Sequence, residues 1–219
     1  MEKCKYDAVL FDLDGTVSRS HPGIIACVKK TVAESGYTLP EDFDYFQFIG
    51  PPIYQSMMEY CRMPAEEAEH WTRVYRGYYN GEGILNTSLY PGLKALMLRL
   101  QSAGVKVCLA TSKPQPMTDR VVSFLEIGDV VFCSAGADPA DKVSDKPGLI
   151  ARCLRETGAA TEKTVMIGDT RFDAYGAAAS GVDFIGVLYG YGTRAEMEEQ
   201  GAARFAADAA ELAALLFGK

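Results

Sequence analysis

Five short apolar runs punctuate the chain, and each ends at small or polar residues. The runs span residues 8–11, 105–110, 130–133, 164–167 and 184–188. Their length and their content of β-branched residues are typical of strands that are buried on both faces of a sheet. We therefore predict a strand at each run, with the polar residues that follow it lying at the carboxyl end of that strand.

Segments with helical periodicity lie between these runs. Leu93, Leu96 and Leu100 share one face of a predicted helix, and similar apolar faces recur at residues 121–125 and 149–154. Strands that alternate with helices favour a parallel sheet covered by helices on both faces. The sequence therefore predicts an α/β fold with a three-layer, Rossmann-like core, in which ligands bind at the carboxyl ends of the strands.

Residues 17–88 interrupt this alternation. They are rich in aromatic residues, which we interpret as the interior of a small domain rather than as a substrate cage. We predict an all-helical insertion after the first strand, within the usual size range of a small domain. The core then consists of residues 1–16 and 89–219. The insertion contains three stretches with helical periodicity: 24–35, 53–61 and 65–79.

The balance of charge narrows the range of partners. The 219 residues carry a formal net charge of −7. A protein with this charge does not attract nucleic acid or an anionic membrane through its overall field. It also repels phosphorylated molecules at long range. Any phosphate chemistry therefore requires a local cation or a locally positive cradle.

The N-terminal segment and the cysteines bear on the cellular compartment. The first apolar run is too short for a signal peptide or a membrane span. None of the six cysteines belongs to a C-x-x-C pair, and no spacing of histidine and cysteine suggests zinc. We expect a cytoplasmic protein with free thiols and no membrane partner.

Two carboxylates, Asp12 and Asp14, follow the first predicted strand. Alternate side chains of an extended chain point the same way, so both carboxylates can face one site. Two close anions need a cation, and Mg²⁺ prefers oxygen ligands and also binds phosphate. Gly15 permits a sharp turn, and Thr16 can cap a helix or bind a ligand. The alternative is a helix-capping turn with an incidental second aspartate.

A second acidic cluster follows the fourth predicted strand, at Gly168, Asp169 and Asp173. The two aspartates are four residues apart, so they share a face if a helix begins here. Both would also complement the positive end of that helix, which is the alternative explanation. A helix end does not explain why two strands both end in aspartate, so the two clusters together favour a metal site.

Polar residues that suit phosphate lie at two further places. Thr111 and Ser112 end the second predicted strand, where a hydroxyl and backbone N–H groups can hold phosphate oxygens; a simple turn is the alternative. Lys146, which precedes a proline, can neutralise a nucleophile and a phosphate. Lys113 and Lys142 are candidates for the same role, and a solvated surface lysine is the alternative for each.

These four segments, in this order, resemble the haloacid-dehalogenase-like hydrolases over nearly the whole chain. The insertion is similar to the helical cap of the phosphoglycolate phosphatase-like branch. Residues 48–52 and 185–192 resemble a bacterial subgroup labelled phosphoglycolate phosphatase or 5′-nucleotidase. The resemblance rests on D-x-D-G-T at 12–16, an apolar strand ending in Thr111, a lysine before proline at Lys146, and G-D-x-x-x-D at 168–173.

The resemblance implies roles for the residues of the first and last motifs. Asp12 is expected to be the nucleophile and a ligand of Mg²⁺. Asp14 is expected to offer its backbone carbonyl to the metal, while its side chain acts as general acid and then as general base. Asp169 is the third protein ligand of the metal. Asp173 supports the waters of the metal or Lys146, and Gly15, Thr16 and Gly168 support these groups.

The resemblance also implies a phosphate cradle. Thr111 binds the phosphoryl oxygens, and Lys146 orients and neutralises them. Many relatives carry asparagine where this chain has Ser112, which keeps a hydroxyl but lacks the amide. Specificity is expected to come from the insertion and its hinge: Arg19, His21, Gly50 and Gln55.

The function implied is a Mg²⁺-dependent phosphatase that hydrolyses a small phosphate monoester through an aspartyl-phosphate. A dehalogenase attacks carbon and needs neither a proton donor nor a metal, so Asp14 and Asp169 favour phosphate over halide. A phosphosugar mutase of the β-phosphoglucomutase kind would keep the same core residues and remains an alternative. A non-enzymatic binding module is a third possibility, which the intact motifs oppose. The chain is expected to be a monomer or a homodimer.

Overall fold

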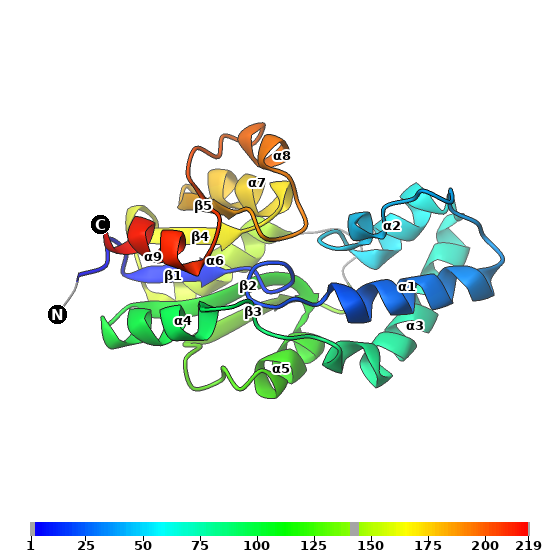
Figure 1. Ribbon diagram of the computed structural model, residues 1–219, viewed down its shortest axis with the longest axis horizontal. Helices are drawn as coiled ribbons and strands as arrows, with labels where there is room; N and C mark the ends of the chain where they lie inside the picture. Colours follow the sequence, from blue (N-terminus) through cyan, green and yellow to red (C-terminus); the bar gives the residue numbers. More distant parts are fainter. Residues whose placement is uncertain (1–2, 141–144, 219) are drawn as a thin grey trace.

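A six-stranded parallel sheet forms the centre of the molecule (Figure 1). The computed structural model describes residues 3–140 and 145–218. The strand order is β3-β2-β1-β4-β5-β6, and every neighbouring pair is parallel. The strands are β1 (Ala8–Phe11), β2 (Lys106–Pro114), β3 (Cys133–Ala137), β4 (Thr164–Gly168), β5 (Asp183–Val187) and β6 (Phe205–Ala206).

Strand β1 occupies the middle of the sheet because both of its faces are apolar. All four of its residues are completely buried. Val9 and Phe11 belong to the core on one face, and Ala8 and Leu10 to the core on the other. The strand pairs with β2 and β4 in register, so that Phe11 lies beside Leu109 on one side and Ile167 on the other. Strands β1 and β4 therefore end within one residue of each other, whereas β2 continues to Pro114.

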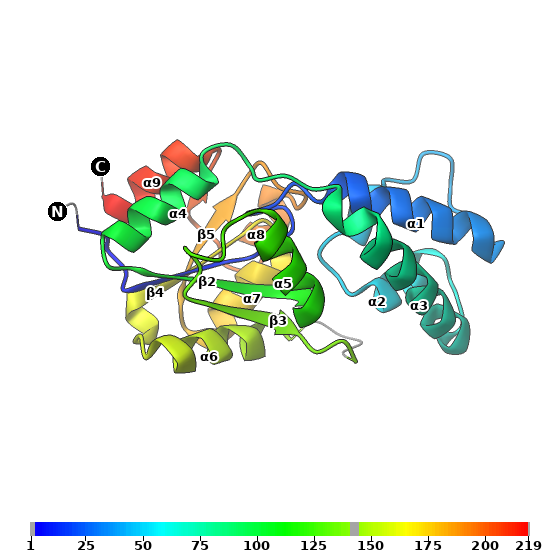
Figure 2. The same ribbon diagram turned by 90° about the horizontal axis from the view of Figure 1, so that it is seen from below.

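Helices cover both faces of the sheet, which makes the core a three-layer structure. Apolar residues of α4, α5 and α9 pack on one face, and those of α6 and α7 pack on the other. Figure 2 shows α4 and α9 on the opposite side of the sheet from α6. The core helices are α4 (Leu93–Ser102), α5 (Gln115–Phe124), α6 (Lys146–Thr157), α7 (Arg171–Ser180), α8 (Arg194–Glu198) and α9 (Ala209–Phe217).

A helical unit between β1 and α4 in the sequence lies beyond the carboxyl ends of the strands (Figure 1). We call residues 21–85 the cap. A mainly aromatic and apolar interior, including Phe48, Met57 and Tyr79, holds it together. The cap contains α1 (His21–Ser35), η1 (Tyr45–Phe48), α2 (Ile53–Tyr60), α3 (Ala65–Gly81) and η2 (Gly83–Leu85).

The α/β fold with a helical insertion after the first strand is confirmed. The boundaries 1–16, 17–88 and 89–219 stay a prediction. No helix in the described parts of the chain is both long and apolar enough to cross a bilayer. All six cysteines are free thiols, as expected, and five of them are buried.

The prediction of the third strand at 130–133 is wrong in position, because β3 begins at Cys133. The backbone N–H groups of Val130 and Val131 both donate to the carbonyl of Ile127, at 3.1 and 3.2 Å, so the chain still turns at these residues. Small residues then form the strand. A Cβ atom at Gly136 would lie 2.7 Å from Cα of Gln115, so the start of α5 packs directly on the backbone of β3.

Within the cap, α1 and η2 approach so closely that only glycine fits at Gly23. A Cβ atom there would lie 1.9 Å from the carbonyl oxygen of Gly83. We expect Gly23→Ala to lower the free energy of unfolding by roughly 1–3 kcal/mol, because overpacking forces backbone shifts. Gly77→Ala in α3 is the matched control, since nothing lies within 4 Å of its Cβ position. Alanine there should stabilise by up to about 1 kcal/mol. Urea unfolding measures both, and equal effects would contradict the close approach.

Candidate active site

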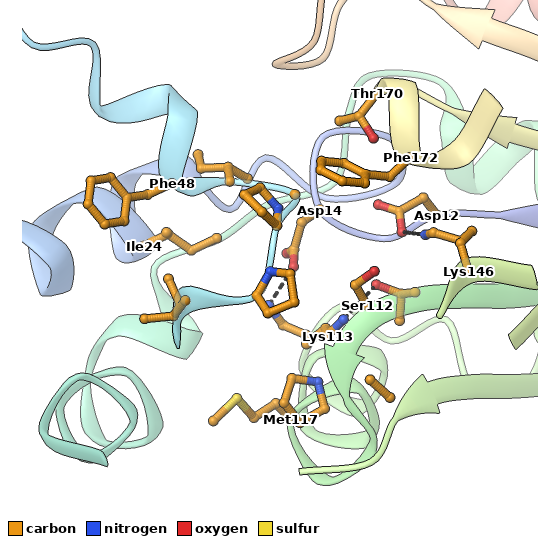
Figure 3. Close-up of a pocket in the computed structure, with 18 of the residues that line it drawn as sticks. Asp12, Asp14, Ile24, Phe48, Ser112, Lys113, Met117, Lys146, Thr170 and Phe172 are labelled. Carbon is orange, nitrogen blue, oxygen red and sulfur yellow. Dashed lines mark hydrogen bonds and ion pairs between the residues drawn. The ribbon is translucent and has the colours of Figure 1, made fainter. Parts of the chain in front are cut away.

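Seven of the predicted site residues line a pocket between the carboxyl ends of β1, β2 and β4 and the cap (Figure 3): Asp12, Asp14, Gly50, Thr111, Ser112, Lys146 and Asp173. Asp169 is not among the described residues that line it, although a carboxylate oxygen of Asp169 lies within 4.8 Å of oxygens of Asp12 and Asp173. This is the edge of an α/β sheet where ligands bind. The core contributes Asp12, Asp14, Thr111, Lys146 and Asp173, among others. The cap contributes a mostly apolar wall. Its lining residues include Ile24, Phe48, Ile49, Pro51, Ile53 and Tyr75.

Lys146 joins two of the aspartates. It is the first residue of α6, and its side chain is only 3% exposed. Its Nζ lies 2.7 Å from Oδ1 of Asp12 and 2.8 Å from Oδ1 of Asp173, and it donates to the carbonyl of Ala110 at 3.0 Å. Burial lowers the pKa of Lys146, but the charges of Asp12 and Asp173 outweigh this effect and leave that pKa above its ordinary value. The lysine therefore stays positively charged.

Asp169 follows β4 and is completely buried. Its Oδ1 accepts a hydrogen bond from the hydroxyl of Thr16 at 2.9 Å, and its Oδ2 accepts one from the backbone N–H of Tyr191 at 2.8 Å. Glycines make room for it. A Cβ atom at Gly15, where φ is +93°, would lie 2.2 Å from Oδ2, and one at Gly190 would lie 2.2 Å from Cβ of Asp169. The loop around Tyr191 therefore fixes the orientation of this carboxylate.

Asp173 lies in the first turn of α7 and is the second carboxylate that contacts Nζ of Lys146. It caps the N-terminus of the helix, because its Oδ2 accepts hydrogen bonds from the backbone N–H and the hydroxyl of Thr170. Gly168 lies directly beneath it, since a Cβ atom there would approach Cβ of Asp173 to 2.3 Å. The helix-capping role that was the alternative for Asp173 is therefore real, and it coexists with the contact to Lys146.

Asp12, Asp169 and Asp173 form a compact acidic group. Each offers a carboxylate oxygen that lies within 4.8 Å of the other two. Burial and then the neighbouring charge of Asp173 raise the pKa of Asp12 to about 7, against the opposing effect of Lys146. Burial and the charges of Asp173 and Asp12 raise the pKa of Asp169 well above its ordinary value. Three buried carboxylates carry more negative charge than one lysine can balance. An oxygen-rich donor set of this kind fits Mg²⁺.

Asp14 lies apart from this acidic group, on the cap side of Asp12 (Figure 3). It does not continue β1, which ends at Phe11, so the strand alternation that predicts a shared face is not what brings it into the pocket. Its Oδ2 pairs with Nζ of Lys113 at 2.7 Å. Of the three candidate lysines, Lys146 therefore faces Asp12 and Lys113 faces Asp14. Lys142 lies outside the described residues.

The predicted phosphate cradle is also at the pocket. Thr111 and Ser112 both line it, and Thr111 is almost completely buried. The hydroxyl of Thr111 accepts a hydrogen bond from the backbone N–H of Lys113 at 3.2 Å, where the pairing of β2 with β3 shifts register. The prediction that the strand ends at Thr111 and Ser112 is wrong in position, because β2 continues to Pro114, and this irregular part of the strand carries both hydroxyl-bearing residues.

The four residues proposed to select the substrate are not together. Gly50 lines the pocket, with φ at +110°. Arg19, His21 and Gln55 are not among the described residues that line it. His21 begins α1, where its backbone N–H donates to the hydroxyl of Tyr191 at 3.0 Å. Arg19 lies over the ring of Tyr90. Their part in specificity stays a prediction.

Sequence reasoning overlooked the loop after β5 and the partners of Asp14. Gly190 and Gly192 lie within residues 185–192, a segment that supports the family resemblance but suggests no role for either glycine. Their function depends on contact with Asp169, which lies about twenty residues away: a Cβ atom at Gly192 would lie 2.2 Å from its carbonyl oxygen. One signal in the sequence could have indicated this contact. Gly190 and Gly192 flank an aromatic residue just after one predicted strand, and Asp169 follows another predicted strand.

Comparison with known proteins gives the same assignment as the geometry. A family model described as haloacid dehalogenase-like hydrolase matches residues 9–187. The chain belongs to the haloacid dehalogenase-like hydrolases. A structure described as a predicted phosphatase from Clostridium acetobutylicum is 30% identical, with a TM-score of 0.89, and the match covers 95% of this chain and 96% of that one.

Curated relatives of this hydrolase carry different names. A 5′-nucleotidase of Pseudomonas aeruginosa is 31% identical over 97% of this chain and 96% of its own length. A phosphoglycolate phosphatase of Cereibacter sphaeroides is 30% identical over 84% of this chain and 85% of its own length. Tyrosine-protein kinase PtkA of Mycobacterium tuberculosis is 33% identical over 84% of this chain, which spans only 62% of that protein.

The glycines around Asp169 allow a test of its placement. We expect Gly190→Ala to reduce turnover of an aryl phosphate by tenfold or more, because the new methyl group would displace the carboxylate. Gly128→Ala is the matched control, since its nearest atom would be 3.9 Å away. Thermal unfolding of both variants separates local displacement from global damage. Wild-type turnover in Gly190→Ala would contradict the close packing.

Proposed function

We propose that this hydrolase is a Mg²⁺-dependent phosphatase that cleaves a small phosphate monoester through an aspartyl-phosphate on Asp12. One observation carries the proposal. Asp12 lines the pocket with one carboxylate oxygen held 2.7 Å from Lys146, close to carboxylate oxygens of Asp169 and Asp173. The family and the phosphatase-named relatives support the same chemistry.

The residues of the pocket divide the work of phosphoryl transfer. Lys146 orients Asp12, so that an oxygen of its carboxylate attacks phosphorus while the bond to the leaving oxygen breaks. Lys146 and the hydroxyl of Thr111 hold the phosphoryl oxygens, since this reaction depends mainly on positioning and on charge stabilisation. Bound by Asp12, Asp169 and the backbone carbonyl of Asp14, Mg²⁺ would neutralise the carboxylates and the phosphate.

Asp14 handles the proton in both half-reactions. It gives a proton to the leaving oxygen as the first P–O bond breaks. It then takes a proton from the water that attacks the aspartyl-phosphate, which releases phosphate and restores Asp12. Asp14 lies on the cap side of Asp12 (Figure 3). This position suits the role, because in the proposed reaction the leaving group extends toward the cap. The apolar wall of the cap excludes water from the reacting groups.

Phosphate release with Mg²⁺ tests the proposal. We expect the wild type to hydrolyse p-nitrophenyl phosphate and Asp12→Asn to lose activity by roughly a thousandfold or more, because the nucleophile is gone. Asp14→Asn should form acid-stable phosphoenzyme but turn over slowly, because the base for water is gone. The same assay on phosphoglycolate, nucleoside monophosphates and hexose phosphates identifies the substrate. Equal turnover by wild type and Asp12→Asn would refute the proposal, and isomerisation of a hexose phosphate without phosphate release would favour the mutase.

Metal binding has a readout that is independent of turnover. Without metal, the raised pKa of Asp12 means that its protonation stabilises the folded state below about pH 4, and this stability is lost as pH rises through about 7. Mg²⁺ replaces the proton, so the rise in Tm that Mg²⁺ causes should grow between pH 5 and pH 8. Asp169→Asn should show a smaller rise at every pH. A rise that is independent of pH, or equal in the variant, would contradict this site.

A further inference from the structure

Lys113 is the second buried lysine of the pocket, and no motif accounts for it. Its side chain is 4% exposed and projects from β2 toward Asp14 (Figure 3). Nζ lies 2.7 Å from Oδ2 of Asp14 and donates to the hydroxyl of Tyr79 at 2.8 Å. The lysine thus touches a core carboxylate and a residue of cap helix α3 at once.

Tyr79 is itself held rigidly. It is 2% exposed, and its ring stacks on Tyr75 with 5.7 Å between centroids and an angle of 8° between the ring planes. Its ring also lies 4.7 Å from Nζ of Lys113, in the range of a cation–π contact. A tyrosine fixed in this way limits where the ammonium group can lie, and the ammonium group in turn limits where Asp14 can lie.

Stability alone does not explain this arrangement. A buried ion pair contributes little net stability, because the loss of hydration offsets the attraction. The contact does fix one oxygen of Asp14. With Oδ2 held by Lys113, the one contact to Oδ1 from the described residues is a long one of 3.4 Å from the hydroxyl of Ser18, so Oδ1 is the oxygen available to exchange a proton. Asp14 can keep the contact from Lys113 in its protonated form, since Oδ2 then accepts as a carbonyl oxygen.

We propose that Lys113 and Tyr79 are positioning residues that together hold Asp14 at the leaving-group end of the pocket. The inference rests on the proposed function, in which Oδ1 gives a proton to the leaving oxygen as the P–O bond breaks and later takes one from water. Tyr79 belongs to the cap, whereas Lys113 and Asp14 belong to the core. The acid is therefore fully oriented only where the cap covers the core.

Leaving groups of different basicity test this proposal. p-Nitrophenolate leaves readily without a proton, whereas phenolate depends on one. We expect Lys113→Met and Tyr79→Phe to lower kcat/KM for phenyl phosphate by about tenfold or more, within the range of general acid catalysis. The value for p-nitrophenyl phosphate should fall by about threefold at most, because kcat/KM reports on formation of the phosphoenzyme. The ratio between the two substrates is the measured quantity.

Two control variants separate positioning from general damage. Tyr78→Phe removes the neighbouring hydroxyl of α3, which donates to Glu34 on the outside of the cap. Lys94→Met removes an exposed lysine of the core, 4.0 Å from Glu126. Both should keep the wild-type ratio, and thermal unfolding of all four variants confirms that they are folded.

Each remaining outcome decides a specific point. If Lys113→Met and Tyr79→Phe lower both substrates by the same factor, or lower neither, the positioning role is wrong. If only Lys113→Met changes the ratio, the part assigned to the cap is wrong. If the wild type shows no Asp12-dependent turnover of either aryl phosphate, the proposed function fails instead.

Discussion

Concentrated negative charge at the ends of two neighbouring strands is the constraint on which this structure depends. Asp12 and Asp169 follow adjacent strands, and Asp173 is one turn further on, so the parallel sheet forces three carboxylates together. Lys146 supplies one positive charge from the first turn of α6. The remaining negative charge makes the site unfavourable on its own and receptive to a cation. In the proposed function, that cation gives an acidic protein a local place for phosphate.

The second charge pair of the pocket has a different character. Asp14 and Lys113 balance one another, and they lie between the acidic group and the cap. The pocket is thus divided into a charged end, where the proposed reaction takes place, and a largely apolar end formed by the cap. Relatives carry names as different as 5′-nucleotidase and phosphoglycolate phosphatase, and one fold can carry different functions at such a site.

The sequence predicts the parts of the site that depend on the strand ends. Asp12, Thr111 and Asp169 follow apolar runs whose length and composition identify them as strands, so their convergence follows from the parallel sheet. It does not predict contacts between cap and core, because Tyr79 and Lys113 meet only once the two are packed together. The position of the edge strand β3 is not predicted correctly for a different reason. Its residues are small because α5 packs on its backbone, and small residues carry no hydrophobic signal.

The packing around Asp169 shows that residues without a side chain can determine the geometry of a site. Gly15, Gly190 and Gly192 come from two loops far apart in the sequence, and each provides only empty volume where a methyl group would collide with the aspartate. Part of the information for the proposed metal site therefore resides in positions with no functional group at all. A search for reactive side chains alone overlooks these glycines, although they determine the position of the carboxylate as much as Asp169 itself does.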